Sequence, residues 1–598
     1  NRTAARTDPF LAYREFYRGD VDILFSLHGD HHVRFGLDHE DTTMDQLSVR
    51  NGDANYTVRT SGSGNAGLGL GANVSYFERR VFNSGGGFEG TSDAYYIQDS
   101  WDVTDRLNVS LGWRLDKMEV ANPNGETFMK FDHEEAIRTG FSYDLFGDQS
   151  SKVYGFYGRY YLPIPSNTSF RMAAPALDVS EFFLAPTSGP LVDSNGQPIL
   201  GAQIVNQTTT GPCPTSPYLV SSGNADACVV RNPGVAPAVE DTIAENLQST
   251  YEDEYILGYS TQFNNEWSGG ISLTYRSLGR VAEDAGLDHA VTNYCMRHGL
   301  DLYSLGCTFS GSDVFRIINP GEDARIHLAT ALPNGEQTIT LSNDLDINLP
   351  PVRREYLGLE FTVSRAWDGK WGLDASYTLS RSEGNFEGAL KSDIGQVDPG
   401  ITEDYDFLSF IPGQYGLLPN HRAHQLKVRG SYALMDNLIA GGVLTVFSPR
   451  HYGCVGAASA GYAPGPDLYD NTTLGTANPD PTPDDIPDYT DGQLTNDLYG
   501  VPANARFCNG VVVDRGSKFT TDWLYNVDLS FRYDLPESVM RFGHGTLRLD
   551  IFNVFNAQGV QEANENGELA VGTPDPHYQA ATAYQTPRSV RIGFDWAF

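Results

Sequence analysis

The feature that most constrains the fold is a strict alternation of apolar and polar side chains that recurs along the chain. Near the C-terminus, residues 589–598 read SVRIGFDWAF. The apolar side chains fall on every second position: Val590, Ile592, Phe594, Trp596 and Phe598. A period of two is the period of a β-strand, whose successive side chains point to opposite faces. The segment is therefore predicted to be a strand with one apolar face and one polar face.

The same alternation appears in other segments, among them 106–116 (RLNVSLGWRLD), 370–379 and 525–533. Aromatic residues make up 12% of the chain and there are 62 glycines, a composition that favours strands and turns over helices. No segment approaches the run of roughly 20 apolar residues that a membrane-spanning helix needs. A membrane-spanning β-strand needs only about 10 alternating residues. The pattern therefore predicts an all-β, transmembrane antiparallel barrel.

The alternating segments form pairs that are separated by short polar turns. We expect seven hairpins, at 20–28 with 31–44, 93–104 with 106–120, 135–146 with 152–164, 253–264 with 267–280, 354–366 with 370–382, 421–435 with 438–450, and 523–535 with 544–556. Together with the terminal strand they give about 15 strands. The segments between the hairpins are long and rich in Gly, Pro, Asn, Asp and Ser: 165–252, 281–352, 383–420, 451–522 and 557–588. Short turns at one end and long external loops at the other are typical of outer-membrane barrels.

An odd number of strands is unusual for a bacterial barrel, which has an even number. The chain begins at Asn1 without a Met and without a visible export signal. We therefore expect residues 1–598 to be the C-terminal part of a longer barrel, whose first strands are not in this chain.

Several short segments resemble the barrel of TonB-dependent outer-membrane receptors, particularly the Oar-like group. They are YIQDSW at Tyr96–Trp101, LGWRLD at Leu111–Asp116, EYILG at Glu254–Gly258, NHRAHQLKVRG at Asn420–Gly430 and LDIFNVFN at Leu549–Asn556. The closing aromatic residue, Phe598, also resembles the C-terminal signature of these barrels. The resemblance implies a location in the bacterial outer membrane and 22 strands around an N-terminal plug. The plug and the segment that binds TonB would then lie outside this chain.

The six cysteines all fall in the long segments and lie there as neighbours. The simplest of the 15 possible connectivities joins Cys213 to Cys228, Cys295 to Cys307, and Cys454 to Cys508. No CxxC motif and no zinc-like spacing is present. We expect three structural disulfides, each of which ties one external loop.

Two clusters of polar residues are candidate metal sites, and each has a simpler interpretation. His28, Asp30, His31 and His32 offer imidazole ligands, but neighbouring side chains on a strand point to opposite faces, so a polar hairpin turn is favoured. A Pro-rich acidic loop offers oxygen ligands for calcium at Asp484, Asp485, Asp488 and Asp491, without the EF-hand spacing. A solvated acidic loop is favoured there, and no other cofactor is expected.

Charged residues at polar positions of the strands are predicted to line the lumen, where a plug or a substrate contacts them: Arg114, Asp116, Arg159, Asp374, Arg429 and Asp550. The net charge of −35 argues against a nucleic-acid partner. No hydrolase, metalloprotease or phosphate-loop motif is found, and no enzymatic activity is expected.

The sequence therefore predicts a barrel of the TonB-dependent type that takes up an unidentified substrate larger than a simple ion. Its expected partners are outer-membrane lipid and lipopolysaccharide, the plug and TonB. The alternative is a structural or adhesive barrel whose loops bind a surface layer, a matrix or a partner protein at the cell surface. Both alternatives share every predicted strand.

Overall fold

The computed structural model describes most of the chain. The described residues are 6–7, 10–50, 52–205, 212–224, 227–302, 304, 306–307, 314–393, 395–396, 401–457, 505–536, 539, 543–570 and 572–597.

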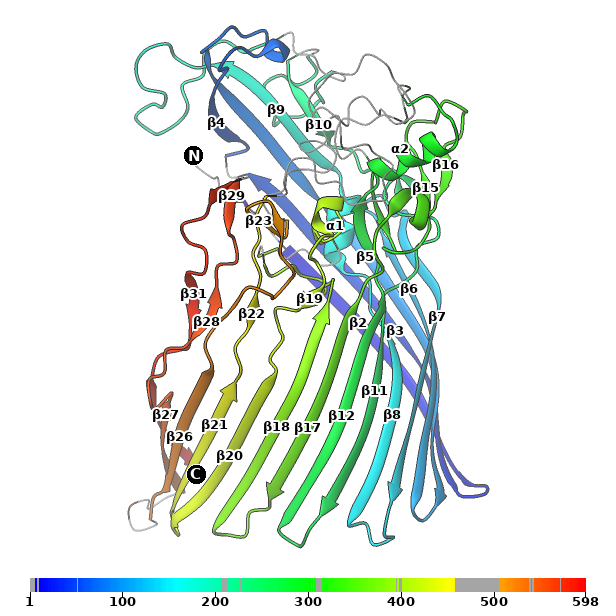
Figure 1. The fold of residues 1–598 in the computed structure, drawn as a ribbon, viewed down its shortest axis with the longest axis vertical. Coiled ribbons are helices and arrows are strands. Elements are labelled where there is room, and N and C mark those ends of the chain that lie inside the picture. The colour runs from blue at the N-terminus through cyan, green and yellow to red at the C-terminus, as the bar shows by residue number, and fades with distance from the viewer. Residues whose placement is uncertain are drawn as a thin grey trace.

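Fifteen long antiparallel strands form a curved wall (Figure 1), and each pairs with the next one along the wall. In order they are β2 (Phe10–Ser26), β3 (Asp30–Arg50), β5 (Ser75–Thr104), β6 (Leu107–Ala121), β7 (Thr127–Asp144), β8 (Ser151–Tyr161), β11 (Tyr251–Gln262), β12 (Trp267–Arg280), β17 (Arg354–Arg365), β18 (Trp371–Gly384), β20 (His424–Met435), β21 (Leu438–Phe447), β26 (Leu524–Asp534), β27 (His544–Phe552) and β32 (Ser589–Ala597). The predicted all-β barrel class is confirmed.

The connections at the two ends of the wall differ in length. At the lower end in Figure 1, turns of a few residues join strands into hairpins, for example residues 105–106 between β5 and β6 and residues 436–437 between β20 and β21. At the upper end, residues 51–74, 162–250, 281–353, 385–423, 448–523 and 553–588 form long connections between hairpins, whereas residues 122–126 between β6 and β7 form a short one. We call these the turn end and the loop end. A barrel of the outer membrane exposes its long loops to the outside, so the loop end is the external end.

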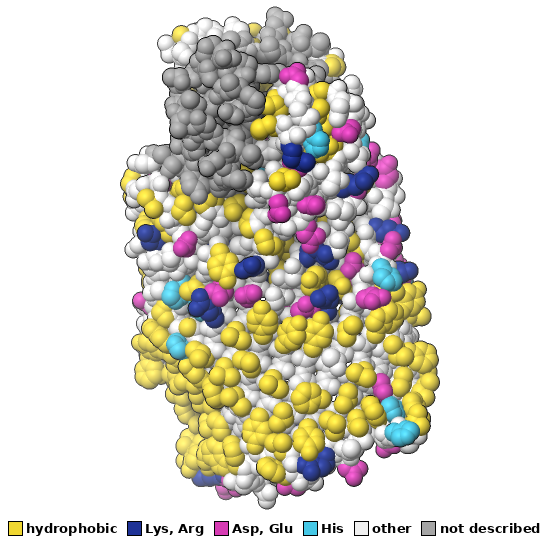
Figure 2. Space-filling view, turned by 45° about the vertical axis from the view of Figure 1, so that its right-hand side comes forward, with side chains coloured by type: hydrophobic (Ala, Val, Ile, Leu, Met, Phe, Trp, Pro, Cys, Tyr) yellow, Lys and Arg dark blue, Asp and Glu magenta, His cyan; other side chains and the backbone are white. Residues whose placement is uncertain are grey.

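The outer face of the wall carries a belt of exposed apolar side chains (Figure 2), which occupies the half of the molecule nearer the turn end. Val590, Ile592, Phe594 and Trp596 of β32 are 60%, 78%, 54% and 54% exposed. In water such a belt would be unfavourable, but hydrocarbon solvates it. The belt is therefore the surface that faces lipid.

The two edge strands of the wall, β2 and β32, are not paired with each other in the part of the chain that the structure describes. Every residue of β2 is exposed. The backbone groups along these two edges thus remain available for pairing. Among the described residues, no helix is long and apolar enough to cross a membrane.

Above the belt the wall extends into a second region of sheet, which the sequence did not predict. Strand β5 is 30 residues long, and its first ten residues leave the barrel to pair with β4 (Asn55–Thr60) on one side and β9 (Ala176–Leu184) on the other. β10 (Val229–Pro233) extends this upper sheet from β9. Short strands β1 (Arg6–Thr7) and β19 (Gly416–Leu417) are added to β3 and β18.

The long connections pack into a cap that has its own hydrophobic core. The largest buried cluster joins residues from 244 to 411, including Leu287, Ile318, Ile326, Leu341 and Tyr405. The cap holds six two-stranded sheets, β13 (Glu283–Gly286) with β14 (Phe315–Ile318), β15 (Ala324–His327) with β16 (Thr338–Leu341), β22 (His451–Tyr452) with β25 (Phe519–Thr520), β23 (Phe507–Cys508) with β24 (Val511–Val512), β28 (Val560–Ala563) with β31 (Ala581–Tyr584), and β29 (Glu568–Ala570) with β30 (Thr573–Pro574). Its helices are η1 (Ala66–Leu68), α1 (Ser166–Ala173), η2 (Val239–Asp241), α2 (Asp288–Arg297), η3 (Asn343–Ile347) and η4 (Leu408–Phe410).

Candidate functional site

The inner face of the wall is lined by charged side chains that neutralise one another. Asp38 of β3 accepts hydrogen bonds from Arg18 of β2 at 2.6 Å and from Arg114 of β6 at 2.8 Å, and Arg114 also contacts Asp116 at 2.9 Å. Each of these residues comes from a strand position opposite the apolar belt. The alternation of the sequence therefore places charged residues of β2, β3 and β6 in one network.

A second group of charges lies farther along the wall. Arg429 of β20 donates to Asp374 of β18 at 3.0 Å, and Arg591 of β32 donates to Asp550 of β27 at 2.9 Å. Ser530 of β26 also donates to Asp550, at 2.7 Å. All of the predicted lumen residues except Arg159 thus lie on the inner face.

Two hollows open along this inner face. The larger, of about 860 Å³, is lined by Asp374, Arg429, Ser530 and Asp550, and it lies toward the turn end. The smaller, of about 420 Å³, lies over β2, β3, β5 and β6, and Arg114 contributes to its wall. Volumes of this size are typical of sites for small organic ligands rather than for a bare ion.

The prediction that Arg159 faces the lumen is wrong. Arg159 shares its face of β8 with Tyr157, whose ring lies 4.9 Å from that of Tyr255 on the outer face. Its guanidinium donates two hydrogen bonds of 2.8 Å to Asp253 and stacks 4.1 Å from the ring of Tyr251. β8 carries aromatic residues at both alternating positions, so the alternation did not decide which face is apolar.

At the loop end the three cysteine pairs expected from the sequence are the three disulfides of the structure. Cys213–Cys228 lies against the upper sheet, in a cluster with Val81, Leu177 and Val179. Cys295–Cys307 joins α2 to the segment that follows it. Cys454–Cys508 joins two positions 54 residues apart. Each bond closes a long connection, so the cap is covalently restrained at three places.

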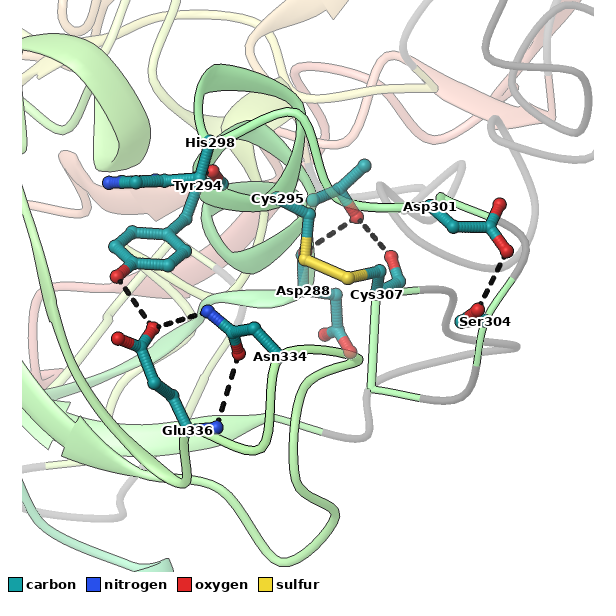
Figure 3. Close-up of a disulfide and its surroundings, with 10 residues drawn as sticks. Asp288, Tyr294, Cys295, His298, Asp301, Ser304, Cys307, Asn334 and Glu336 are labelled. Carbon is teal, nitrogen blue, oxygen red and sulfur yellow. Dashed lines mark hydrogen bonds between the residues drawn. A yellow bond between two sulfur atoms is a disulfide. The ribbon is translucent and has the colours of Figure 1, made fainter.

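Figure 3 shows how the second disulfide is held. The hydroxyl group of Thr292 donates to the carbonyl oxygen of Cys307 at 3.1 Å, which fixes the second cysteine against helix α2. On the other side of the helix, Tyr294 donates to Glu336 at 3.2 Å, and Asn334 donates to the same carboxylate at 2.9 Å. The disulfide and these hydrogen bonds join three separate stretches of one connection.

The cap also buries a set of charged residues that no pattern in the sequence groups together. Asp404 is fully buried, and Lys391 donates to it at 3.0 Å while Arg515 lies at 3.5 Å. Glu283 is also fully buried, and one of its oxygens accepts a hydrogen bond from the backbone N–H of Thr402. Arg515 lies 111 positions from Asp404 and Glu283 lies 119 positions from Thr402, and no local motif marks these contacts.

The environments of these groups shift their pKa values. Burial, together with the nearby Asp404 and Asp406, raises the pKa of Glu283 well above its ordinary value. Burial likewise raises the pKa of Asp406. Burial lowers the pKa of His289 to about 4, and its Nε2 lies 2.8 Å from the carbonyl oxygen of Ile347. Burial therefore favours the protonated forms of Glu283 and Asp406 and the neutral form of His289.

The structure describes one of the two candidate metal sites, the histidine-rich turn, but not the acidic loop. His31 lies 2.7 Å from Asp99 and His32 lies 2.7 Å from Asp22, so the two rings point to opposite faces of the hairpin. Asp484, Asp485, Asp488 and Asp491 lie outside the described residues. Across the part of the chain that is described, no three His, Cys, Asp or Glu side chains are grouped so as to hold a metal ion.

Comparisons with known proteins point to one group. A family model described as an outer membrane beta barrel domain matches residues 20–137. The TonB-dependent transporter Oar of Myxococcus xanthus is 22% identical over 620 residues, which cover 95% of this chain and 49% of Oar. The chain thus spans about half the length of this curated relative.

Similar solved structures are remote in sequence. A structure of the FpvAI–pyocin S2 complex aligns with a TM-score of 0.45 at 12% identity, over 99% of this chain and 50% of the matched chain. The siderophore receptor PiuA of Acinetobacter baumannii aligns with a TM-score of 0.44 at 11% identity, over 98% of this chain and 56% of PiuA.

Proposed function

Because this chain is an outer-membrane β-barrel related to the TonB-dependent transporters, we propose that it forms most of the wall of a transporter that takes up a cargo larger than a simple ion. The observation that carries the proposal is the contrast between the two faces of the wall. The outer face is a lipid-solvated belt, whereas the inner face is a charged and hydrogen-bonding surface with hollows of about 860 and 420 Å³. Such a lumen is suited to a hydrated ligand or a protein domain.

The two unpaired edges of the wall, β2 and β32, indicate how the barrel is closed. Within hydrocarbon, every backbone N–H and C=O must be paired, and only a closed barrel achieves this. We therefore infer that further strands connect β2 to β32 and close the barrel. The charged inner face supports a plug as the next partner, and TonB would act through that plug.

Uptake that depends on both this protein and TonB is the test of the transport proposal. Cells that carry the gene, cells that lack it and cells that lack TonB are grown with a pool of peptides and oligosaccharides, and mass spectrometry follows which compounds leave the medium. We expect a class of compounds to be depleted only when the protein and TonB are both present. Depletion that is the same in all three strains would contradict transport.

A matched pair of variants connects uptake to the lumen. Ser530 lines the larger hollow, whereas Val527, three positions earlier in β26, faces the opposite side of the strand and is not among the residues that line the hollow. Ser530→Trp should slow uptake because it fills part of the hollow, whereas Val527→Trp should not. If the protein instead served adhesion, loss of the gene would weaken attachment to a surface or to other cells regardless of TonB, and neither variant would matter.

A further inference from the structure

A small apolar pocket lies where the barrel wall meets the cap, away from the two hollows of the lumen. Its volume is about 210 Å³. Its walls come from the upper ends of β7 and β12, from the start of α1, and from two segments of the cap, and they include Met129, Phe131, Ile164, Leu278, Ile317 and Phe386. Five of these six side chains are buried. The pocket is therefore lined mainly by buried apolar side chains.

The size of the pocket limits what it can hold. Drug-sized ligands occupy pockets of roughly 300–1,000 Å³, whereas an apolar cavity of about 150 Å³ is large enough for benzene. A pocket between these sizes accommodates one aromatic ring or one branched aliphatic group. Close-packed interiors have few voids larger than a water molecule, so a cavity of this size at the boundary of barrel and cap needs an explanation.

One unpaired cation lies at this apolar cavity. Arg354, from the start of β17, lines the pocket. A Cβ atom placed on Gly388, which also lines the pocket, would lie 3.1 Å from Nη1 of Arg354, so the guanidinium end of the side chain is at the cavity. Arg354 makes no side-chain hydrogen bond or ion pair with any residue that the structure describes. Its five N–H donors are thus free to bind an anionic ligand group.

The acidic side chain of Glu283 also lines the cavity, and in its neutral form it would not repel an anionic ligand. Glu283 is fully buried, and its Oε2 has no hydrogen-bond partner among the described residues, while the other oxygen accepts from Thr402. Burial raises the pKa of this carboxyl group and so favours its protonated form, and a protonated carboxyl group donates a hydrogen bond. Arg354 therefore offers N–H donors at the edge of an apolar cavity, and Glu283 in its protonated form adds an O–H donor.

We propose that this pocket binds an apolar carboxylate, with one aromatic or branched aliphatic group in the cavity and its carboxylate paired with Arg354. This proposal rests on the proposed transport function for its biological meaning, since it would identify a chemical group of the cargo. The same chemistry is found at the C-terminus of a peptide that ends in an apolar residue and in a free aromatic or aliphatic acid.

Binding to the purified full-length protein in detergent tests the proposal by isothermal titration. The probes are N-acetyl-phenylalanine, its uncharged amide, and acetate, which has the charge without the ring. We expect the acid to bind at least about ten-fold more tightly than the amide, because the charge-assisted pair with Arg354 is lost in the amide. Acetate should not bind measurably, because it leaves the cavity empty.

Variants assign the binding to this pocket. Arg354→Gln should remove the preference for the acid and leave the affinity for the amide unchanged. Ala389→Trp, which places a large side chain at an exposed position of the pocket wall, should weaken both probes. Arg381→Gln is the matched control, because Arg381 is an exposed arginine that pairs with Glu383 away from the pocket.

The proposal is overturned if the wild-type protein binds acid and amide equally, if Arg354→Gln keeps the preference for the acid, or if no saturable binding occurs at millimolar concentrations. A Gly-Gly-Phe peptide and its C-terminal amide then distinguish the sources: binding of the free peptide indicates a peptide end, and its exclusion indicates a free acid. Because the titration needs neither TonB nor a membrane potential, failure of uptake in cells would leave this result unaffected.

Discussion

At the scale of single residues, two buried acids of the cap, Asp404 and Glu283, differ in whether they pair with a cation. Lys391 and Arg515 both donate to Asp404, whereas Glu283 accepts from the backbone N–H of Thr402 and pairs with no cation among the described residues. A carboxylate without a cation is costly to bury, so Glu283 is accommodated as the neutral acid. The packing around Glu283 therefore depends on a proton, and the packing around Asp404 does not.

This difference predicts a pH dependence for the cap. Because the pKa of Glu283 is raised in the folded state, the folded cap binds more protons than the unfolded one once the pH exceeds the ordinary value of a glutamic acid. The stabilisation is complete below that ordinary value and is lost as the pH rises through the raised pKa. Hydrogen-exchange protection factors for residues 281–302 should therefore fall toward alkaline pH, and Glu283→Gln should reduce this slope.

Two controls accompany this measurement. Glu240→Gln, at an exposed position of the cap, should keep the wild-type slope. The pKa of His289 is lowered to about 4, so its contribution is lost as the pH falls from its ordinary value toward 4, and this acid-side loss should persist in Glu283→Gln. An unchanged alkaline slope in Glu283→Gln would refute the assignment.

A buried ion pair in the upper sheet gives a second prediction. Glu181 is fully buried and accepts hydrogen bonds from Arg79, which is itself buried, and from Ser221. Glu181→Ala would leave the arginine uncompensated and should destabilise β9 by about 3–5 kcal/mol. Native-state hydrogen exchange of the β9 amides measures this free energy of opening.

The matched control for this ion pair is an exposed one. Glu245 pairs with Arg325 at 2.6 Å, but both side chains are about half exposed. Exposed pairs contribute roughly 0–1 kcal/mol, so Glu245→Ala should leave β9 unchanged. Equal effects of the two substitutions would show that burial of Glu181 is not the cause.

At the scale of elements, the sequence predicts the hairpins well because each is local. Each barrel strand has one face toward lipid and one toward the aqueous lumen, which imposes the two-residue period, and a short polar turn marks each hairpin. The upper part of β5 lies beyond the lipid belt, and Gly85–Gly87 interrupts its alternation, so its length and its pairing with β9 were not predicted. The cap core and the apolar pocket depend on contacts between distant loops, which no local pattern records.

The longest disulfide-closed segment gives an element-scale prediction. Cys454 and Cys508 are 54 residues apart, and the loop-entropy model assigns roughly 3–5 kcal/mol to closing a segment of this length. In the double variant Cys454→Ser and Cys508→Ser, the neighbouring pairs β22–β25 and β23–β24 should lose hydrogen-exchange protection. The barrel strands β20 and β21 should keep theirs, because their ladder does not depend on this bond.

The corresponding comparison is the pair Cys295 and Cys307, which are only 12 residues apart. Their replacement by serine should expose α2 while β22 to β25 keep their protection. Thiol alkylation without reductant should label neither the wild-type protein nor the remaining pairs, since the structure has no free cysteine. If β22 to β25 kept full hydrogen-exchange protection in the Cys454→Ser and Cys508→Ser variant, contacts other than the disulfide would hold this part of the cap, and the prediction would be wrong.

At the scale of the whole molecule, one wall separates two solvents. Residues that are adjacent in sequence face lipid on one side and the lumen on the other, which is why the lumen charges other than Arg159 could be predicted from alternation. The cap is different, since its interior resembles that of a soluble domain. The molecule thus combines a barrel organised by the membrane with a cap organised by burial and disulfides.

The division into two solvents predicts opposite outcomes for substitutions at neighbouring positions of β12. Leu273 is 41% exposed on the outer belt and lies beside Leu257 and Leu359, whereas Ser272 faces the lumen beside Gly258 and Glu360. An arginine on the lipid face costs about 2–4 kcal/mol near the middle of the bilayer. Leu273→Arg should therefore lower the unfolding free energy of the protein in vesicles by this amount.

Ser272→Arg adds the same side chain one residue away but points it into water, next to the carboxylate of Glu360. We expect little loss of stability, within roughly 0.5 kcal/mol, since substitutions at solvated positions usually have small effects. Guanidinium titration of both variants in lipid vesicles, followed by tryptophan fluorescence, compares them directly. A greater loss for Ser272→Arg than for Leu273→Arg would mean that the two faces have been assigned the wrong way round, and the transport path proposed for the inner face would then have no basis.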